Sequence, residues 1–264
     1  MTPVKSEDPG RHDDGTIHSH RFAAANMATP FVNHDTEQMS QVEKFLKSGF
    51  ISVDIFSVAP VDEKAEGVRM LRRAGDAPQA LSSSGAGEEA EQSGPVFIRD
   101  VGQLAAPIDK AAPPLAPGAT ARVDVVVRTR RIGHFFPGGT LDSFDIWLEL
   151  QGTDADGRVV FWSGQVQDEG KGPVEEGAHF YRSYQLDADG NPINKRNAWQ
   201  SRSVLYVRNI GPGAADTVHY RVRVPKDARG PITLTAKLNY RKFSHYYTQF
   251  AFAGVPKEIG RAHV

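Results

Sequence analysis

In the segment FDIWLEL, Phe144 to Leu150, every second residue from the first is apolar. In an extended strand, side chains two positions apart lie on the same face. Its alternate positions therefore place one set of apolar side chains together: Phe144, Ile146, Leu148 and Leu150. This period of two predicts a β-strand with one buried face.

Strands of the same kind occur on both sides of this segment. ARVDVVV places three valines on one face, at 123, 125 and 127, and the pattern continues in GRVVFWSG, HFYRSYQL, SVLYVRNI, TVHYRVRV and ITLTAKLNY. Turns such as DADG and PGAAD join them, with no helical pattern between. The sequence therefore predicts a mainly β fold, an antiparallel immunoglobulin-like β-sandwich of about seven or eight strands.

The rest of the chain is organised around this sandwich. Residues 1–34, polar and rich in His, Asp and Gly, are expected to form an extended His-rich arm, and residues 35–49 a short helix that docks on the sandwich. The sandwich itself is expected over residues 50–243, with a mobile low-complexity loop at about 75–118. Residues 244–264 are expected to form a C-terminal tail.

The expected helix has a start signal and a stop signal. Asp35 is placed to cap its first turn, with Gln38 three residues on, and Gly49 follows its last turn. Apolar residues recur at helical spacing between them, at Met39, Val42, Phe45 and Leu46. This stripe is expected to pack on the sandwich.

Composition excludes several classes of protein and site. Lys and Arg total 31 against 32 for Asp and Glu, so the net charge does not favour a nucleic-acid partner. Cysteine is absent, which excludes disulfides, thiolate metal sites and covalent haem attachment through Cys-x-x-Cys-His. No run is apolar and long enough to span a membrane, and the first residues lack the apolar core of a signal peptide. Searches for hydrolase, zinc-protease, phosphate-loop and dinucleotide motifs find none, so we do not expect an enzyme.

The arm contains the densest cluster of metal-binding residue types. The segment HDDGTIHSHRF brings together His12, Asp13, Asp14, His18 and His20. His18 and His20, two residues apart, would lie on one side of an extended chain, and together with His12 they are candidate ligands of a transition metal. A solvated His-rich arm with no ligand is the alternative.

Other candidates also have a structural alternative. His179 and His245 lie among aromatic residues and are expected to be hydrogen-bonded structural residues, and His219 alternates with arginines, which indicates a surface position. Each of the two DADG segments, which begin at Asp154 and Asp187, has the start of a calcium loop but lacks its later ligands, which favours a turn.

Several motifs together resemble the haem-free C-terminal region of bacterial multihaem c-type cytochromes. They are SHRFAAAN, FLKSGFISVDIF, GHFFPGGTLDSFDIWLEL, FWSG, AHFYR, DADGNPINKRNAW, VLYVRNIGPGAADTVHYRVRVP and LNYRKF, which run from about Ser19 to Phe243. The combination of SHRF, Gly-His-x-Phe-Pro-x-Gly and LNYRKF carries the resemblance.

This resemblance implies a periplasmic or extracellular electron-transfer protein in which the sandwich packs against a haem-bearing segment or subunit. It implies His20 as the distal axial ligand of a haem c attached elsewhere, with His18 as the second choice. For His134 two interpretations stay open: a role at the interface with the haem-bearing part, or a structural imidazole that satisfies a backbone carbonyl near Pro137.

The absence of cysteine departs from the family pattern, because any haem c must then come in trans or from a missing upstream part. A fragment, a mis-set start codon or a split gene would explain the missing haem motifs and signal peptide. The alternative function is a β-sandwich without a redox role that binds carbohydrate or protein through its end loops and the exposed members of Trp147, Trp162 and Trp199.

Overall fold

A computed structural model describes residues 3–19, 21–61, 68–72, 96–99, 104–110, 115–141 and 143–252. The chain divides into two compact units, of which the first comprises Met1–Ile55, Val125–Val218 and Arg229–Val264, and the second comprises Phe56–Asp124 and His219–Ala228. The fold is mainly β with several antiparallel sheets, which is consistent with the predicted β-sandwich. The finer immunoglobulin-like topology remains a prediction.

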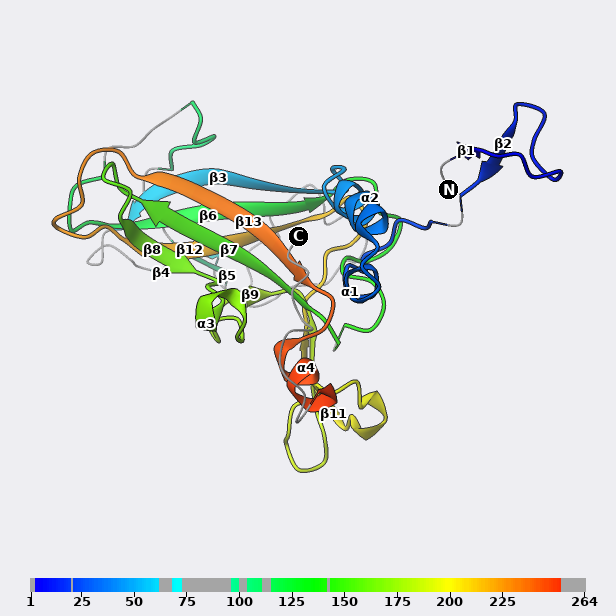
Figure 1. Ribbon diagram of the computed structural model, residues 1–264. Coiled ribbons are helices and arrows are strands. Elements are labelled where there is room, and N and C mark those ends of the chain that lie inside the picture. The colour runs from blue at the N-terminus through cyan, green and yellow to red at the C-terminus, as the bar shows by residue number, and fades with distance from the viewer. Residues whose placement is uncertain are drawn as a thin grey trace. The chain divides into compact units, whose positions relative to one another are not determined.

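One sheet of the first unit is built around β7 (Asp145–Thr153), the strand that contains most of FDIWLEL. It pairs with β13 (Thr233–Arg241) on one side and with β8 (Val159–Ser163) on the other, and β9 (His179–Phe180) also pairs with β7. All of these pairings are antiparallel, and Leu148 lies opposite Leu238. Figure 1 shows β13, β7 and β8 side by side.

β7 is buried on both of its faces, so the prediction of a single buried face was wrong for this strand. Leu148 and Leu150 have no exposed surface, as the alternation predicted, while Trp147 on the opposite face packs with Val174, Ala178 and Phe180. The indole N–H of Trp147 donates to the carbonyl of Gly164 at 2.9 Å. Gly164 has φ of 84°, and a Cβ there would lie 2.7 Å from the Leu148 carbonyl oxygen, so only glycine fits.

A second sheet has the strand order β12 (Ala215–Arg223), β6 (Thr120–Thr129) and β3 (Ile51–Val61). Along β12, buried and exposed side chains alternate: Val218, Tyr220 and Val222 are buried, whereas His219, Arg221 and Arg223 are exposed. This alternation agrees with the period of two in the sequence.

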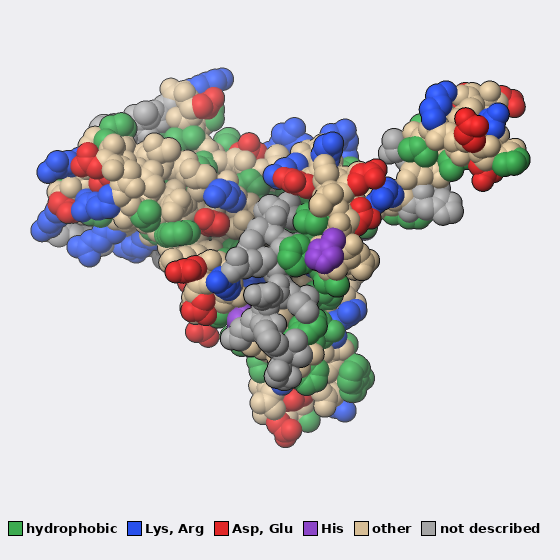
Figure 2. Space-filling view, viewed as in Figure 1, with side chains coloured by type: hydrophobic (Ala, Val, Ile, Leu, Met, Phe, Trp, Pro, Cys, Tyr) green, Lys and Arg blue, Asp and Glu red, His purple; other side chains and the backbone are tan. Residues whose placement is uncertain are grey.

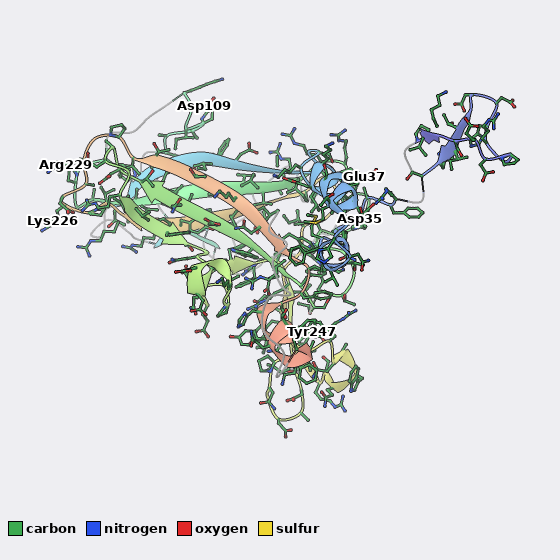
Figure 3. The ribbon with its side chains drawn as sticks, in the orientation of Figure 1. Asp35, Glu37, Asp109, Lys226, Arg229 and Tyr247 are labelled. Carbon is green, nitrogen blue, oxygen red and sulfur yellow. The ribbon has the colours of Figure 1, made fainter. Side chains whose placement is uncertain are left out.

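The predicted helix is α2 (Thr36–Leu46), and the side chain of Asp35 accepts a hydrogen bond from the backbone N–H of Gln38, as expected of a cap. Figure 3 labels Asp35 and Glu37 at its start. Three further short helices were not predicted: α1 (Ala28–Val32), α3 (Gln167–Gly170) and α4 (His245–Ala251), with a 3₁₀ turn η1 (Ala198–Gln200).

The expected N-terminal arm and C-terminal tail both contain regular secondary structure that the sequence did not predict. The arm over residues 1–34 contains the hairpin of β1 (Pro3–Lys5) and β2 (Thr16–His18) as well as α1. The tail over residues 244–264 begins with α4, which Ser244 caps by accepting from the N–H of Tyr247. Residues 253–264 lie outside the described part of the chain.

Two hairpin-like pairs complete the strands. β4 (Val68–Arg72) pairs with β5 (Val96–Arg99), and β10 (Ser183–Leu186) pairs with β11 (Ser203–Val207). β5 lies inside the segment expected as a loop over 75–118, where its short apolar run forms strand pairs despite the low-complexity neighbours. Most of that predicted loop lies outside the described residues.

Both DADG segments form turns. The carboxylate of Asp154 accepts from the backbone N–H groups of Asp156 and Arg158, and that of Asp187 accepts from Asp189 and Asn191. These bonds explain the leading aspartates without a bound ion. Among the helices of the described residues, none combines the length and the apolar character that crossing a membrane needs.

Candidate functional site

The loop between β6 and β7 carries the Gly-His-Phe-Phe-Pro-Gly-Gly motif and lies in the first unit. Its backbone is fixed at Phe136, which exchanges two hydrogen bonds with Ile210 at 2.8 and 2.7 Å. Pro137 is buried, whereas His134 and Phe135 are exposed. Backbone hydrogen bonds at Phe136 therefore fix the loop, while the imidazole of His134 and the phenyl ring of Phe135 are exposed to solvent.

The imidazole of His134 is held in one orientation by a local hydrogen bond. Its Nδ1 lies 2.7 Å from the carbonyl oxygen of Phe135. A carbonyl can only accept, so Nδ1 carries the proton and donates it. In the neutral ring, the other nitrogen, Nε2, then has a lone pair that can bind a metal ion or accept a hydrogen bond.

Gly138 explains the glycine of the motif. A Cβ on Gly138 would lie 2.8 Å from Cε1 and 2.9 Å from Nδ1 of His134, closer than such contacts occur. Any larger residue would displace the ring and break its bond to Phe135. At Gly133, in the same loop, an added Cβ would meet open space, with no atom within 4 Å. The motif therefore specifies the orientation of the imidazole through Gly138.

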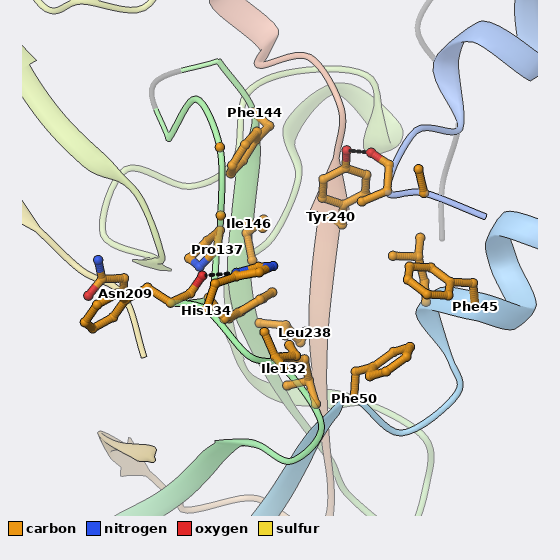
Figure 4. A pocket seen from close by; sticks show the side chains of 18 of the residues that line it. Phe45, Phe50, Ile132, His134, Pro137, Phe144, Ile146, Asn209, Leu238 and Tyr240 are labelled. Atoms are coloured by element: carbon orange, nitrogen blue, oxygen red, sulfur yellow. Dashed lines mark hydrogen bonds between the residues drawn. The ribbon is translucent and has the colours of Figure 1, made fainter. Parts of the chain in front are cut away.

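His134 stands beside an open cleft of about 1340 Å³ in the first unit. This exceeds the 300–1,000 Å³ of most small-molecule sites. The walls are mainly apolar and come from the end of α2, the motif loop, β7 and β13: Phe45, Phe50, Ile132, Phe144, Ile146 and Leu238. Figure 4 shows the His134 ring between the Pro137 side of the cleft and the side formed by Tyr240. The cleft can accommodate a large apolar ligand.

Charged side chains of a single sign line this cleft. Four cationic residues take part, Lys47, Arg131, Lys237 and Lys242, and no Asp or Glu is among the described residues that line it. Burial and the charge of Arg196 lower the pKa of Lys242. Lys47 pairs with the carboxylate of Glu43 at 2.6 Å. The cleft therefore suits a ligand that combines an apolar body with negative groups.

The segment after the SHRF motif borders the cleft. The guanidinium of Arg21 pairs with the carboxylate of Asp35 at 2.6 Å, and the hydroxyl of Tyr240 donates to the carbonyl of Ala25. Burial raises the pKa of Tyr240 above its ordinary value, so its phenol stays protonated and keeps donating. Ala24 and Ala25 both line the cleft.

The histidines of the arm are only partly described. The rings of His12 and His18, both exposed, lie 5.2 Å apart between centroids in the β1–β2 hairpin, and His20 lies outside the described residues. Within the described ranges, no three His, Cys, Asp or Glu side chains gather as a metal site would require. The metal site of His12, His18 and His20 and the axial role of His20 or His18 stay predictions.

Two histidine–aspartate pairs were not predicted as pairs. His179 Nε2 lies 2.9 Å from Asp216 Oδ2, which also accepts from the hydroxyl of Tyr181. In the second unit, His219 Nδ1 lies 2.7 Å from Asp124. The partners are far apart in sequence, so no local signal could have revealed them.

Both aspartates are held in the charged form. The hydrogen bond from His179 outweighs the desolvation of Asp216, so its pKa falls below the ordinary value. Burial alone would raise the pKa of Asp124, but hydrogen bonds from Ser57, His219 and Arg122 reverse the shift and lower it. The two histidines are thereby fixed in position, which is the structural role expected of His179.

The tryptophans do not form an exposed aromatic row. Trp147 is 3% exposed, whereas Trp162 on β8 is 39% exposed and Trp199 in η1 is 76% exposed. The two exposed rings belong to different elements, and Trp162 donates to the carboxylate of Glu149. Trp147 is thus excluded from the carbohydrate-binding set, and its role is in the core.

No protein-family model and no curated protein matches the chain. Among solved structures, it is similar to a penta-haem cytochrome c552 from Thermochromatium tepidum, with a TM-score of 0.39 and 17% identity over 55% of this chain. The match spans 34% of that cytochrome's length, about a third.

Proposed function

We propose that this chain is a haem-free accessory module of a multihaem cytochrome c-like electron-transfer protein, and that the cleft beside His134 receives a haem edge of the haem-bearing segment or subunit. The observation that carries the proposal is the lone-pair nitrogen of His134 at an apolar cleft lined by cations and, among the described residues, no carboxylate. The motifs that resemble the haem-free cytochrome region include this loop.

The residues of the cleft fit a haem in three respects. A haem has a large apolar ring, which Phe45, Phe50 and Leu238 can contact. It carries two propionates, which the lysines can pair with. Its iron accepts an imidazole nitrogen, and Nε2 of His134 is the nitrogen left open.

A bound haem would supply one-electron transfer, and this chain's own residues would exclude water from its edge and orient it. The Nδ1–H bond to Phe135 fixes the tautomer and the ring plane of His134, so little conformational entropy is lost on binding. We further propose a periplasmic or extracellular location, and His20, with His18 as second choice, as the alternative axial ligand. The SHRF motif is followed directly by the residues that border the cleft.

A haem peptide with an open axial position tests the proposal. Such a peptide carries its haem on Cys-x-x-Cys-His and turns low-spin when a second imidazole binds, which the Soret and visible bands report. We expect the chain to produce this change and His134→Ala to weaken it by about tenfold or more. His219→Ala, an exposed histidine of the second unit, is the matched control.

The arm variants decide which imidazole binds. If His20→Ala or His18→Ala removes the low-spin spectrum while His134→Ala preserves it, the arm supplies the ligand and the assignment of the iron ligand to His134 is wrong. A chain that leaves the spectrum of the haem peptide unchanged at saturating concentration would overturn the proposal altogether.

A further inference from the structure

We infer that the free edge of β11 is a docking site for an extended peptide segment of a partner protein, one with apolar side chains in its middle and acidic residues at its ends. This surface belongs to the first unit and does not include the cleft. The inference therefore stands or falls independently of haem binding.

β11 presents an unusual amount of apolar surface for a strand. Val204 is 56% exposed, Leu205 60% and Val207 50%. No residue of Ser203–Val207 is charged and none is proline, so the strand lacks two of the usual protections of an edge. It has one irregularity, a register shift at Leu205 between the pairs Tyr184–Tyr206 and Gln185–Val204. Figure 2 shows hydrophobic side chains at the surface in the lower part of the view, where Figure 1 places β11 and α4.

One edge of β11 is unpaired among the described residues. β10 pairs with it in a two-stranded sheet, and no other described strand joins that sheet. In such a pair, alternate backbone N–H and C=O groups point away from the partner strand. A two-stranded ribbon is only marginally stable alone, so a third strand would both satisfy these groups and stabilise the ribbon.

Contacts between side chains of β10 and β11 order the two-stranded ribbon. The rings of Tyr184 and Tyr206 stack at 5.7 Å between centroids across the two strands. Arg182 lies over Tyr184 and donates to the hydroxyl of Tyr206 at 3.1 Å. Because the ribbon is already ordered, adding a strand costs less conformational entropy.

The charges at the two ends of β11 select the occupant. Arg202, which is exposed, and Arg208, which is half-buried and donates to the carbonyl of Phe180 at 3.1 Å, flank the strand on either side. In an antiparallel pair of two β11 strands centred on Leu205, each Arg202 would lie opposite the other copy's Arg208, and like charges placed opposite each other are destabilising. A strand with acidic ends would instead form an ion pair at each end, so the charges favour a different partner over a second copy.

Two synthetic peptides provide the test on the full chain. Fluorescence anisotropy would compare labelled Glu-Thr-Val-Thr-Val-Thr-Glu with Lys-Thr-Val-Thr-Val-Thr-Lys. We expect the acid-ended peptide to bind roughly fivefold more tightly, and Arg202→Glu to remove most of this preference, because the variant keeps a basic residue at only one end of β11. Hydrogen exchange of the β11 amides should slow when the acid-ended peptide is present, because a third strand protects them.

Matched variants distinguish peptide binding at the β11 edge from nonspecific binding to exposed apolar residues. Leu205→Asn should weaken peptide binding, whereas Val159→Asn, at a valine that is 45% exposed on β8, should not. Equal losses in both variants, equal affinity for both peptides, or a dimer of the unmodified chain that Leu205→Asn converts to a monomer would each overturn the inference. Binding that depends on Leu205 and on the peptide's acidic ends would support it.

Discussion

At the scale of single residues, the orientation of the His134 imidazole depends on the absence of a Cβ atom at Gly138. Gly138→Ala would place a Cβ 2.8 Å from Cε1 of the imidazole, so we expect the ring to turn and lose its bond to Phe135. Long-range ¹H–¹⁵N correlation spectra should report a proton on Nδ1 in the unmodified chain and a changed tautomer mixture in the variant. Gly133→Ala, where the added carbon meets nothing within 4 Å, should leave the spectrum unchanged. Equal spectra for both variants would contradict this role of Gly138.

The pair of His179 and Asp216 predicts an acid dependence of stability. The pKa of Asp216 is lowered in the folded state, so its contribution is present above the ordinary aspartate value near 4 and is lost as the pH falls through the lower, folded pKa. We expect Asp216→Asn to reduce the free energy of unfolding by on the order of 1 kcal/mol at neutral pH, allowing for solvent screening. Urea unfolding at neutral and acidic pH measures this, and the difference between the chains should shrink in acid. A difference that grows in acid would contradict the assignment.

Local sequence patterns identified candidate and structural residues but not the residues they contact. The positions of His134, His179 and Asp35 as candidate or structural residues were predicted, since each stands in a local pattern. The bond from His134 to Phe135 fits the structural interpretation, while the open Nε2 leaves the interface interpretation possible. Asp216 is 37 residues from His179 and lies on β12, in a different sheet from β9, so only the folded chain brings the two side chains together.

At the scale of elements, the side chain of Asp35 stabilises the start of α2 through two interactions. Asp35 accepts from the N–H of Gln38 and pairs with Arg21. We expect Asp35→Ala to lower the free energy of unfolding, because the variant loses both the cap and the pairing with Arg21. Chemical denaturation measures the loss. Glu37→Gln, which removes only the more exposed partner of Arg21, should cost less than half as much.

The elements that were predicted correctly have a strong period, and those that were missed do not. TVHYRVRV alternates over its whole length and FDIWLEL at every position except Trp147, and β7 and β12 follow from that alternation. α4 begins in HYYTQFA, an aromatic run without a helical stripe, and its cap at Ser244 is the only strong signal. The hairpin of β1 and β2 consists of very short strands whose residues are mostly exposed, so no buried face marks it in the sequence.

At the scale of the whole molecule, the amino-acid composition does not show how charged residues are distributed in the folded protein. The totals of 31 basic and 32 acidic residues predict no overall field, yet the cleft gathers cations without a carboxylate among its described lining residues. Lys47 and Lys242 are separated by most of the chain, and neither lies in a basic run. Folding alone brings them to one cleft, so the preference for an anionic ligand could not be read from net charge.

This charge arrangement predicts that binding at the cleft depends on salt. Lys237→Gln combined with Lys242→Gln should weaken binding of the haem peptide by about fivefold at low ionic strength, because each lysine can pair with a propionate. The difference from the unmodified chain should shrink at about 1 M salt, where exposed charges are screened beyond about 3 Å. Lys226→Gln, which alters a lysine of the second unit labelled in Figure 3, should have no effect at either salt concentration. Titrations of the Soret band measure both affinities. If the double variant binds as well as the unmodified chain while His134→Ala still abolishes the low-spin spectrum, the imidazole alone recruits the haem and the lysines serve another ligand.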